Sequence, residues 1–271
     1  LIFSHGIKNA SLAQIITLSR ELNYFFTTHF NQRAQEKEHR VYVVYSGGDD
    51  AFAVGKWDKL MSFAKVLWEE IQSFICYKDN KNDDVHFSAG LFMSNPHYPL
   101  GRFYKDTKAL QERAKDVPGK NRVDVFDYTL SWTSYSDKYE LGNDFCEALK
   151  KGQTNSERKF NASFTYRIMQ LVKSSYQERE GMENGVYFRR GKLRTDKFAR
   201  NIARMHYLFA RNGFSAEDSK IITDKLEQRL IHSFLKNAMN PNDTNGFEAR
   251  DYLVALNFAI LQVRSSQTKT E

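Results

Sequence analysis

The sequence lacks the features that define several large classes of protein. No uninterrupted apolar run approaches the roughly 20 residues of a membrane-spanning helix, and residues 1–6 carry no secretory signal. The only two cysteines, Cys76 and Cys146, have no CxxC spacing and no nearby histidine, which argues against a zinc site. We therefore predict a soluble, cytoplasmic protein that holds reduced cysteines and has no membrane partner.

Charge is spread unevenly along the chain. Residues 1–150 hold 19 basic and 20 acidic side chains, whereas residues 151–271 hold 21 and 13, so the second half carries the whole positive excess. A basic half favours a polyanionic partner, for which nucleic acid is the first candidate. The length of 271 residues suffices for two domains of about 100 to 150 residues each.

The first half alternates helical and strand patterns. Apolar spacing predicts a helix capped by Ser11, and the strand-favouring residues 41–45, followed by a second strand over 51–54, predict a tight hairpin. Further elements are expected as a helix over 57–76, a strand over 85–93, a helix over 100–115 and a strand over 123–128. With one more strand before Leu1, placed centrally, these elements form an α+β, ferredoxin-like sheet with its helices on one face.

The second half is dominated by helical spacing. Residues 129–155 are polar and aromatic without strong periodicity, which indicates a linker. Helices are expected over 161–177, 197–211, 216–239 and 248–263. We therefore predict a domain over 1–128, a linker over 129–155, and an all-α domain over 156–271.

The hairpin turn carries the strongest chemical signal. Gly47 and Gly48 allow positive φ angles and close approach of a triphosphate, while Asp49 and Asp50 supply the hard oxygen ligands that Mg²⁺ prefers. A two-metal site needs at least two carboxylates on rigid strands, and these aspartates provide part of that set. An ordinary hairpin turn is the alternative, because glycine and aspartate are common turn residues.

Three segments together resemble a known family. Residues 45–55 (YSGGDDAFAVG) are similar to the nucleotide-cyclase palm shared by diguanylate cyclases and the large subunit of type III CRISPR effector complexes. Residues 87–92 resemble its next strand, and residues 109–123 its last helix and strand. Asp50, which is Glu in diguanylate cyclases, and the basic helical second half favour the CRISPR subunit, type III-A-like, with its second palm at 1–128.

The resemblance implies an enzyme that makes cyclic oligoadenylate second messengers from ATP in antiviral defence, using Mg²⁺ or Mn²⁺. It implies that Asp49 and Asp50 are catalytic metal ligands, and that the nucleotide-binding residues are Ser46, Gly47, Gly48, Lys115 and Lys120. A backbone cap by Ser46 and solvated lysines at a helix end are the alternatives. A non-catalytic scaffold and a diguanylate cyclase remain alternative functions.

The resemblance also implies a larger assembly. Its partners would be guide RNA, target RNA, small helical subunits and the first palm domain of the same protein. A further aspartate, at the end of the strand expected before Leu1, would complete the metal site, so we expect the chain to be a segment of a larger protein. DNA cleavage is not expected of this segment.

The densest basic run lies in the second half. Arg189, Arg190, Arg200 and Arg204 are candidate contacts for RNA or a protein partner. The alternative is a helix that is packed on one side and solvated on the other, because apolar residues such as Met205 occupy the opposite face.

Overall fold

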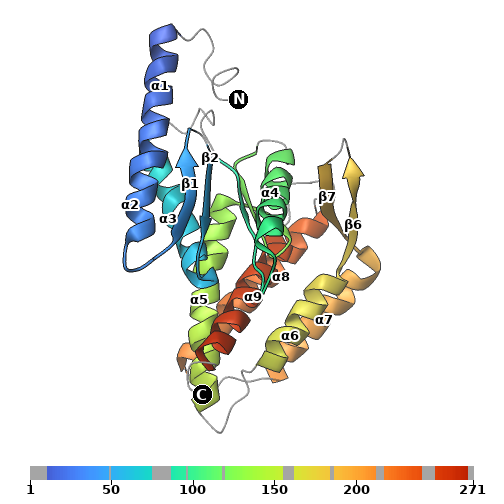
Figure 1. Cartoon of the computed structure of the whole chain (residues 1–271). Helices are drawn as coiled ribbons and strands as arrows, with labels where there is room; N and C mark the ends of the chain where they lie inside the picture. The colour runs from blue at the N-terminus through green and yellow to red at the C-terminus, as the bar shows by residue number, and fades with distance from the viewer. Residues whose placement is uncertain are drawn as a thin grey trace.

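The computed structural model describes most of the chain, namely residues 11–48, 50–74, 87–95, 97–117, 120–154, 162–183, 186–211, 217–239 and 248–267. Figure 1 shows a β-hairpin flanked by helices at the upper left and a second sheet with its own helix beside it. Long helices lie below both sheets, and a further hairpin lies at the right.

The N-terminal helix contains an irregular turn. It runs through α1 (Leu12–Tyr24), a π-helical segment η2 (Phe25–His29) and α2 (Phe30–Gln35). The predicted cap is confirmed: Ser11 Oγ accepts from the Gln14 amide, and the Gln14 side chain accepts from the Ser11 amide at 2.9 Å. Single π-helical turns are rare in proteins, and those that occur are often found at functional sites.

The expected hairpin is formed by β1 (Tyr42–Gly47) and β2 (Asp50–Val54), which pair antiparallel. It is followed by α3 (Trp57–Phe74). Apolar side chains of α1 to α3 pack on one face of the hairpin and form a small core, which contains Phe25, Phe30, Val41, Phe63, Leu67 and Ile71. The turn of the hairpin thus lies at the end of two strands that pack on this core.

A second sheet follows. It comprises β3 (Ala89–Leu91), β4 (Arg122–Val125) and β5 (Tyr128–Ser131), with α4 (Leu100–Asp116) between β3 and β4. β3 pairs parallel with β4, and β4 pairs antiparallel with β5. The strand expected over 123–128 is in fact two strands, because Phe126 and Asp127 take positive φ angles of 53° and 66° and reverse the chain.

The two sheets are separate among the described residues. No backbone ladder joins β2 to β3 there, and a cavity of about 390 Å³ lies between them, lined by residues of both strands and of α3 and α4. The α+β assignment of the sequence is confirmed.

The second half is built from α5 (Trp132–Thr154), α6 (Ala162–Ser174), α7 (Thr195–Arg211), α8 (Glu217–Met239) and α9 (Glu248–Gln267). The linker predicted over 129–155 is wrong, because these residues form most of β5 and all of α5. Helix α5 buries Trp132, Tyr135 and Phe145. It packs against several elements, chiefly α9 but also α3 and α8, and so shows no one-sided periodicity.

The second half also contains an unexpected hairpin of β6 (Tyr176–Glu183) and β7 (Val186–Leu193). The residues between the strands are Asn184 and Gly185, a pair that signals a two-residue hairpin turn. The charged character of both strands obscured this signal. No described helix is long and apolar enough to span a membrane.

We predict that Gly142 is required for the contact between α5 and α9. A Cβ atom there would lie 2.8 Å from Phe258 Cδ1 and 3.1 Å from the carbonyl oxygen of Ala255. Gly142→Ala should lower the free energy of unfolding by about 1 to 3 kcal/mol. The matched control is Gly101→Ala, because an added Cβ at Gly101 meets nothing within 4 Å. Equal stability of both variants in urea unfolding would contradict the proposed close packing.

A buried ion pair connects α4 to the second sheet. Arg113 donates to Asp124 Oδ1 at 2.9 Å and to Asp127 Oδ1 at 3.1 Å, and Thr129 donates to Asp124 Oδ2 at 2.7 Å. Burial raises the pKa of Asp124 to about 6, although Arg113 and Thr129 act in the opposite direction. The folded state therefore holds a proton on this carboxyl that the unfolded chain releases at lower pH.

This pKa predicts how stability depends on pH. The folded value lies above the unfolded value of about 4, so the contribution of Asp124 is complete below pH 4 and is lost as pH rises through 6. Asp124→Asn does not titrate and should remove this component, on the order of 2 to 3 kcal/mol. Urea unfolding should therefore shift in favour of the variant, relative to the parent, between about pH 4 and 7. A difference that is constant with pH would disprove the assignment.

Candidate active site

The Gly-Gly-Asp-Asp turn lies at the upper end of the hairpin, beside α1 (Figure 1). Gly47 pairs with Asp50 across the strands, and Gly48 has a φ of +66°, the left-handed conformation that favours glycine. Asp49 lies outside the described residues. The register shifts at Val44, and a bulge of this kind increases the local twist of a hairpin.

Space and exposure at the turn suit a charged ligand. A Cβ atom on Gly47 or Gly48 would meet nothing within 4 Å, so packing does not explain these glycines. Asp50 is exposed at the first position of β2. Its carboxylate is therefore available on a rigid strand, as a divalent cation such as Mg²⁺ requires. The described part of the turn thus offers one exposed carboxylate, and no group of three or more metal-ligating side chains is found among the residues that the structure describes.

The N-terminal helix holds the turn through two hydrogen bonds. Ser46 Oγ donates to the carbonyl oxygen of Phe26, which lies in the π-helical segment η2. The Gly48 amide donates to Asn23 Oδ1 at 3.3 Å. The hydroxyl of Ser46 is thus bonded within the protein, to a helix carbonyl 20 residues away and not as the local backbone cap that the sequence left open. Asn23 was missed, because nothing in its sequence context distinguishes it.

The turn and α4 share one cavity. Asp50 and Lys115, both predicted site residues, line the space of about 390 Å³ between the two sheets, together with Lys108, Tyr45 and Tyr104. Burial is the largest cause of a raised pKa of Tyr45, and the nearby Tyr104 and Asp50 raise it further above its ordinary value. The structure therefore places Asp50 and Lys115 on the lining of one cavity.

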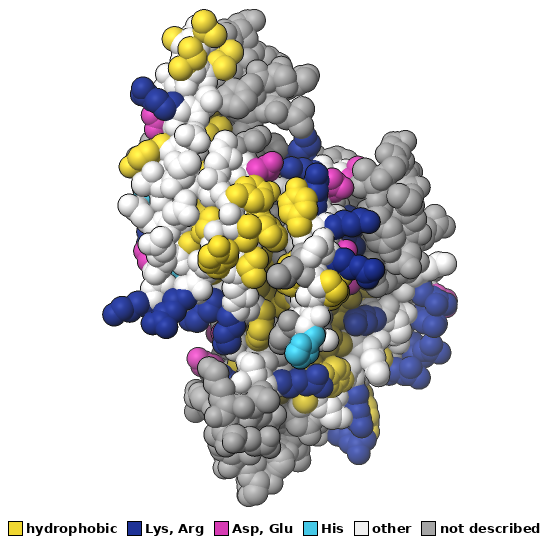
Figure 2. Space-filling model, in the orientation of Figure 1, with side chains coloured by type: hydrophobic (Ala, Val, Ile, Leu, Met, Phe, Trp, Pro, Cys, Tyr) yellow, Lys and Arg dark blue, Asp and Glu magenta, His cyan; other side chains and the backbone are white. Residues whose placement is uncertain are grey.

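An apolar surface surrounds this cavity. The Phe52 ring centre lies 6.1 Å from that of Tyr45 and 5.8 Å from that of Tyr104. Tyr42 and Val44 are also exposed, and Figure 2 shows hydrophobic side chains gathered over the hairpin and the adjacent α4. Exposed apolar patches of this kind mark binding surfaces.

Other predicted residues are not among those that line this cavity. Lys120 is half-buried at a φ of 48°, and it is not among the cavity-lining residues. Arg189 and Arg190 belong to β7, and their side chains lie outside the described part. Arg200 and Arg204 are exposed on α7. The structure thus separates the candidate metal turn from the candidate polyanion contacts.

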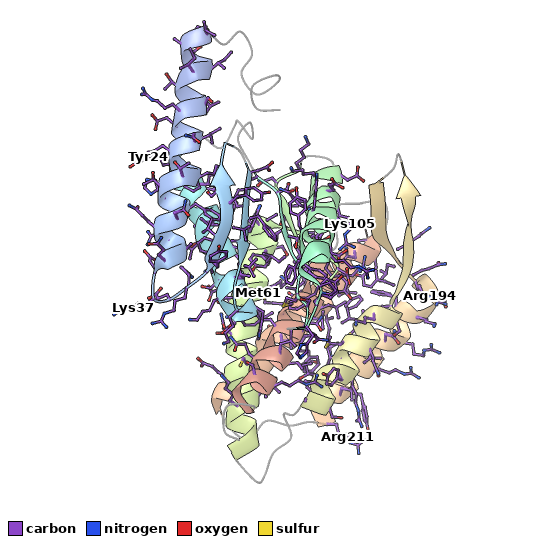
Figure 3. All side chains as sticks on the ribbon, in the orientation of Figure 1. Tyr24, Lys37, Met61, Lys105, Arg194 and Arg211 are labelled. Atoms are coloured by element: carbon purple, nitrogen blue, oxygen red, sulfur yellow. The ribbon has the colours of Figure 1, made fainter. Side chains whose placement is uncertain are left out.

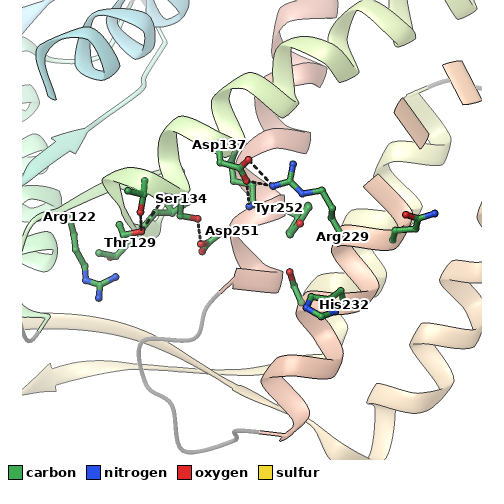
Figure 4. A pocket seen from close by; sticks show the side chains of 14 residues that line it. Arg122, Thr129, Ser134, Asp137, Arg229, His232, Asp251 and Tyr252 are labelled. Carbon is green, nitrogen blue, oxygen red and sulfur yellow. Dashed lines mark hydrogen bonds and ion pairs between the residues drawn. The ribbon is translucent and has the colours of Figure 1, made fainter. Parts of the chain in front are cut away.

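A second, polar cavity of about 710 Å³ lies among β4, β5, α5, α8 and α9 (Figure 4). Arg229 donates to both oxygens of Asp137 at 2.6 and 2.7 Å, and Lys138 donates to the same carboxylate at 2.7 Å. Burial opposes ionisation, but these bonds hold the pKa of Asp137 below its ordinary value. Ser134 donates to Asp251. The donors and acceptors of this network are bonded to one another, and the network therefore joins α5 to α8 and α9.

We predict that Asn23 protects the turn from opening. Asn23→Ala removes the acceptor of the Gly48 amide and should speed its hydrogen exchange, whereas Asn23→Asp keeps an oxygen acceptor and should not. Exchange of a peptide covering residues 46–50 reports this without any activity assay. The control Asn31→Ala removes amide bonds to the carbonyls of Phe26 and Thr27 but leaves the Gly48 bond intact. Equal exchange in the Asn23→Ala variant and the parent would exclude the contact.

Comparisons with known proteins agree with this geometry. Residues 1–124 match the family described as Cas10/Cmr2, second palm domain. The chain is also similar to proteins named CRISPR system single-strand-specific deoxyribonuclease Cas10/Csm1 (subtype III-A). It is 29% identical to that of Enterococcus italicus over 209 residues, which cover 76% of this chain and 23% of the relative.

Two further relatives carry the same name. The protein of Mycobacterium tuberculosis is 28% identical over 211 residues, which cover 69% of this chain and 24% of the relative. That of Streptococcus thermophilus is 25% identical over 262 residues, which cover 94% of this chain and 29% of the relative. The chain thus spans about a quarter of the length of these relatives. Residues 1–124 are thus similar to the Cas10/Cmr2 second palm domain, and the chain is similar to about a quarter of each of these subtype III-A proteins.

Proposed function

We propose that this chain supplies half of a composite ATP site, at which the large subunit makes cyclic oligoadenylates. The observation that carries this proposal is the shared cavity of Asp50 and Lys115 beside a turn with open space at both glycines. A carboxylate and a lysine at one site suit metal-assisted nucleotidyl transfer, in which a hydroxyl attacks a phosphorus and pyrophosphate leaves. The other half of the site would come from the first palm domain of the same protein.

Each residue has a defined task in this proposal. Asp49 and Asp50 would hold divalent cations, Mg²⁺ or Mn²⁺, which when bound would polarise the phosphate and lower the pKa of the attacking hydroxyl. Gly47 and Gly48 would leave room for the triphosphate at the backbone. Lys115 and Lys120 would neutralise triphosphate charge. Asn23 and Ser46 hold the turn in place for these tasks.

The assembly is part of the same proposal. We infer that the subunit works within a ribonucleoprotein in which guide RNA pairs with target RNA, and that small helical subunits contact it. Target RNA would switch synthesis on, and the cyclic products would act in antiviral defence. A scaffold without catalysis would need none of the exposure that Asp50 shows.

Removal of the turn carboxylates tests the activity. The assembled complex, given ATP, Mg²⁺ and matching target RNA, should lose at least about a hundredfold of its oligoadenylate synthesis in Asp49→Ala and in Asp50→Ala, equivalent to about 3 kcal/mol of transition-state stabilisation. Asp116→Ala is the matched control, because this exposed carboxylate at the end of α4 does not line the cavity.

The alternatives give different outcomes in the same assay. Product from GTP and none from ATP would identify a diguanylate cyclase. A complex that assembles on RNA but makes no product from either nucleotide would be a scaffold. Undiminished synthesis by both aspartate variants would exclude the turn as the metal site.

A further inference from the structure

Helix α7 carries a stripe of basic side chains on the side away from its packed face. Lys197, Arg200, Arg204 and Arg211 are three, four and seven residues apart, so they share one side and span about 21 Å along the helix. The opposite side buries Met205 and Phe209. Figure 2 shows Lys and Arg side chains gathered at the lower right, over the elements that Figure 1 places there, and Figure 3 labels Arg194 and Arg211 in this region.

Three of these cations have no acidic partner among the residues that the structure describes. Lys197, Arg200 and Arg204 form no ion pair with any residue that the structure describes, whereas Arg33, Arg113 and Arg229 all do. The sequence of α6 contains no acidic residue, and α7 contains only Asp196, which pairs with Arg194 at 2.9 Å. A surface with this imbalance attracts polyanions.

Aromatic groups lie among the charges. Tyr207 is 60% exposed within the stripe, and the Arg211 guanidinium carbon lies 6.0 Å from its ring centre. The neighbouring helix α6 adds the exposed side chains of Arg167 and Tyr166. Exposed tyrosines next to arginines provide stacking platforms for unpaired bases, which an acidic protein surface does not need.

The surface is rigidly supported. Asn201, buried on α7, donates to Ser174 Oγ and Ser175 Oγ at 2.9 Å each and to the carbonyl of Leu171 at 3.3 Å. Phe164 of α6 stacks edge-on against Phe209 of α7, with ring centres 5.3 Å apart. The spacing of the cations is therefore fixed before any ligand binds, which lowers the entropy cost of binding.

We propose that this α6–α7 face, defined by the α7 residues Lys197, Arg200, Arg204, Tyr207 and Arg211, binds single-stranded RNA. The arginines and lysine contact phosphates, and Tyr207 stacks on a base. Charge and aromatic content select a single-stranded polynucleotide. The choice of RNA over DNA rests on the proposed function, in which the subunit works on an RNA-guided complex.

The test uses the full-length large subunit and a fluorescent, unstructured RNA, with affinity measured by anisotropy at about 50 to 200 mM salt. Arg200→Glu combined with Arg204→Glu should weaken binding about tenfold or more and reduce the slope of log affinity against log salt by about 1.4. Arg20→Glu combined with Lys37→Glu changes the net charge equally at distant exposed positions and should leave the slope intact. In Figure 3, Lys37 lies on the opposite side from Arg194 and Arg211.

Conservative variants separate contact from folding. Arg200→Lys combined with Arg204→Lys keeps the charge and should retain most of the affinity. Tyr207→Ala should weaken binding about fivefold or more, while Tyr207→Phe keeps the ring and should bind like the parent. Ultraviolet cross-links to the RNA should fall on residues 195–211.

Several results would overturn the proposal. Equal affinity and slope in the charge-reversed and control variants would show that the α6–α7 face does not contact RNA. Tighter binding of DNA of the same sequence, lost in the same variants, would make DNA the ligand. Effective competition by an acidic polypeptide, with no effect of Tyr207→Ala, would indicate a protein partner. None of these measurements needs ATP or metal, so they are independent of oligoadenylate synthesis.

Discussion

The close packing of α5 along α9 is the constraint on which the rest of the structure depends. Gly142 allows the two helices to approach until only a hydrogen fits between its backbone and the Phe258 ring. Through this contact the buried residues of the second sheet, such as Val125 and Leu130, belong to one core with Phe258 and Val263. The palm is therefore not an independent unit that carries a flexible appendage. Its strands are placed by helices that come from the far end of the chain.

The candidate active site is held in place by a different element, the N-terminal helix. The π-helical turn at η2 presents the Phe26 carbonyl to Ser46, and one helical turn earlier Asn23 reaches the Gly48 amide. A hairpin turn with two glycines has high conformational entropy, and such a turn alone would hold metal ligands loosely. The two bonds from the helix restrict this turn, and in the proposed function they would keep its carboxylates in position for metal ions. This explains why the irregular turn of the helix lies beside the Gly-Gly-Asp-Asp turn.

Much of the first half could be predicted because its signals are local. Ser11 and Gln14 form a capping box three residues apart, and valines and aromatic residues on either side of a Gly-Gly-Asp-Asp turn indicate the hairpin. Helix α5 could not be found in this way, because a helix buried on several sides loses the period that identifies it. The role of Asn23 depends on a contact between positions 25 residues apart, which no local pattern encodes. The β6–β7 hairpin was predictable in principle from Asn184-Gly185, but charged strands resemble loops in composition.

The separation of charges within the chain follows from what each surface must bind. A turn that holds divalent cations needs carboxylates that no arginine neutralises, and the described residues place no arginine among those lining the cavity of Asp50. A surface that holds a polyanion needs the reverse, and α7 meets this need with a single acidic residue that is already paired. Lysines do line the cavity with Asp50, namely Lys108 and Lys115, as contacts to a triphosphate would require. In the proposed function, the uneven distribution of charge along the sequence would therefore let one chain hold both surfaces.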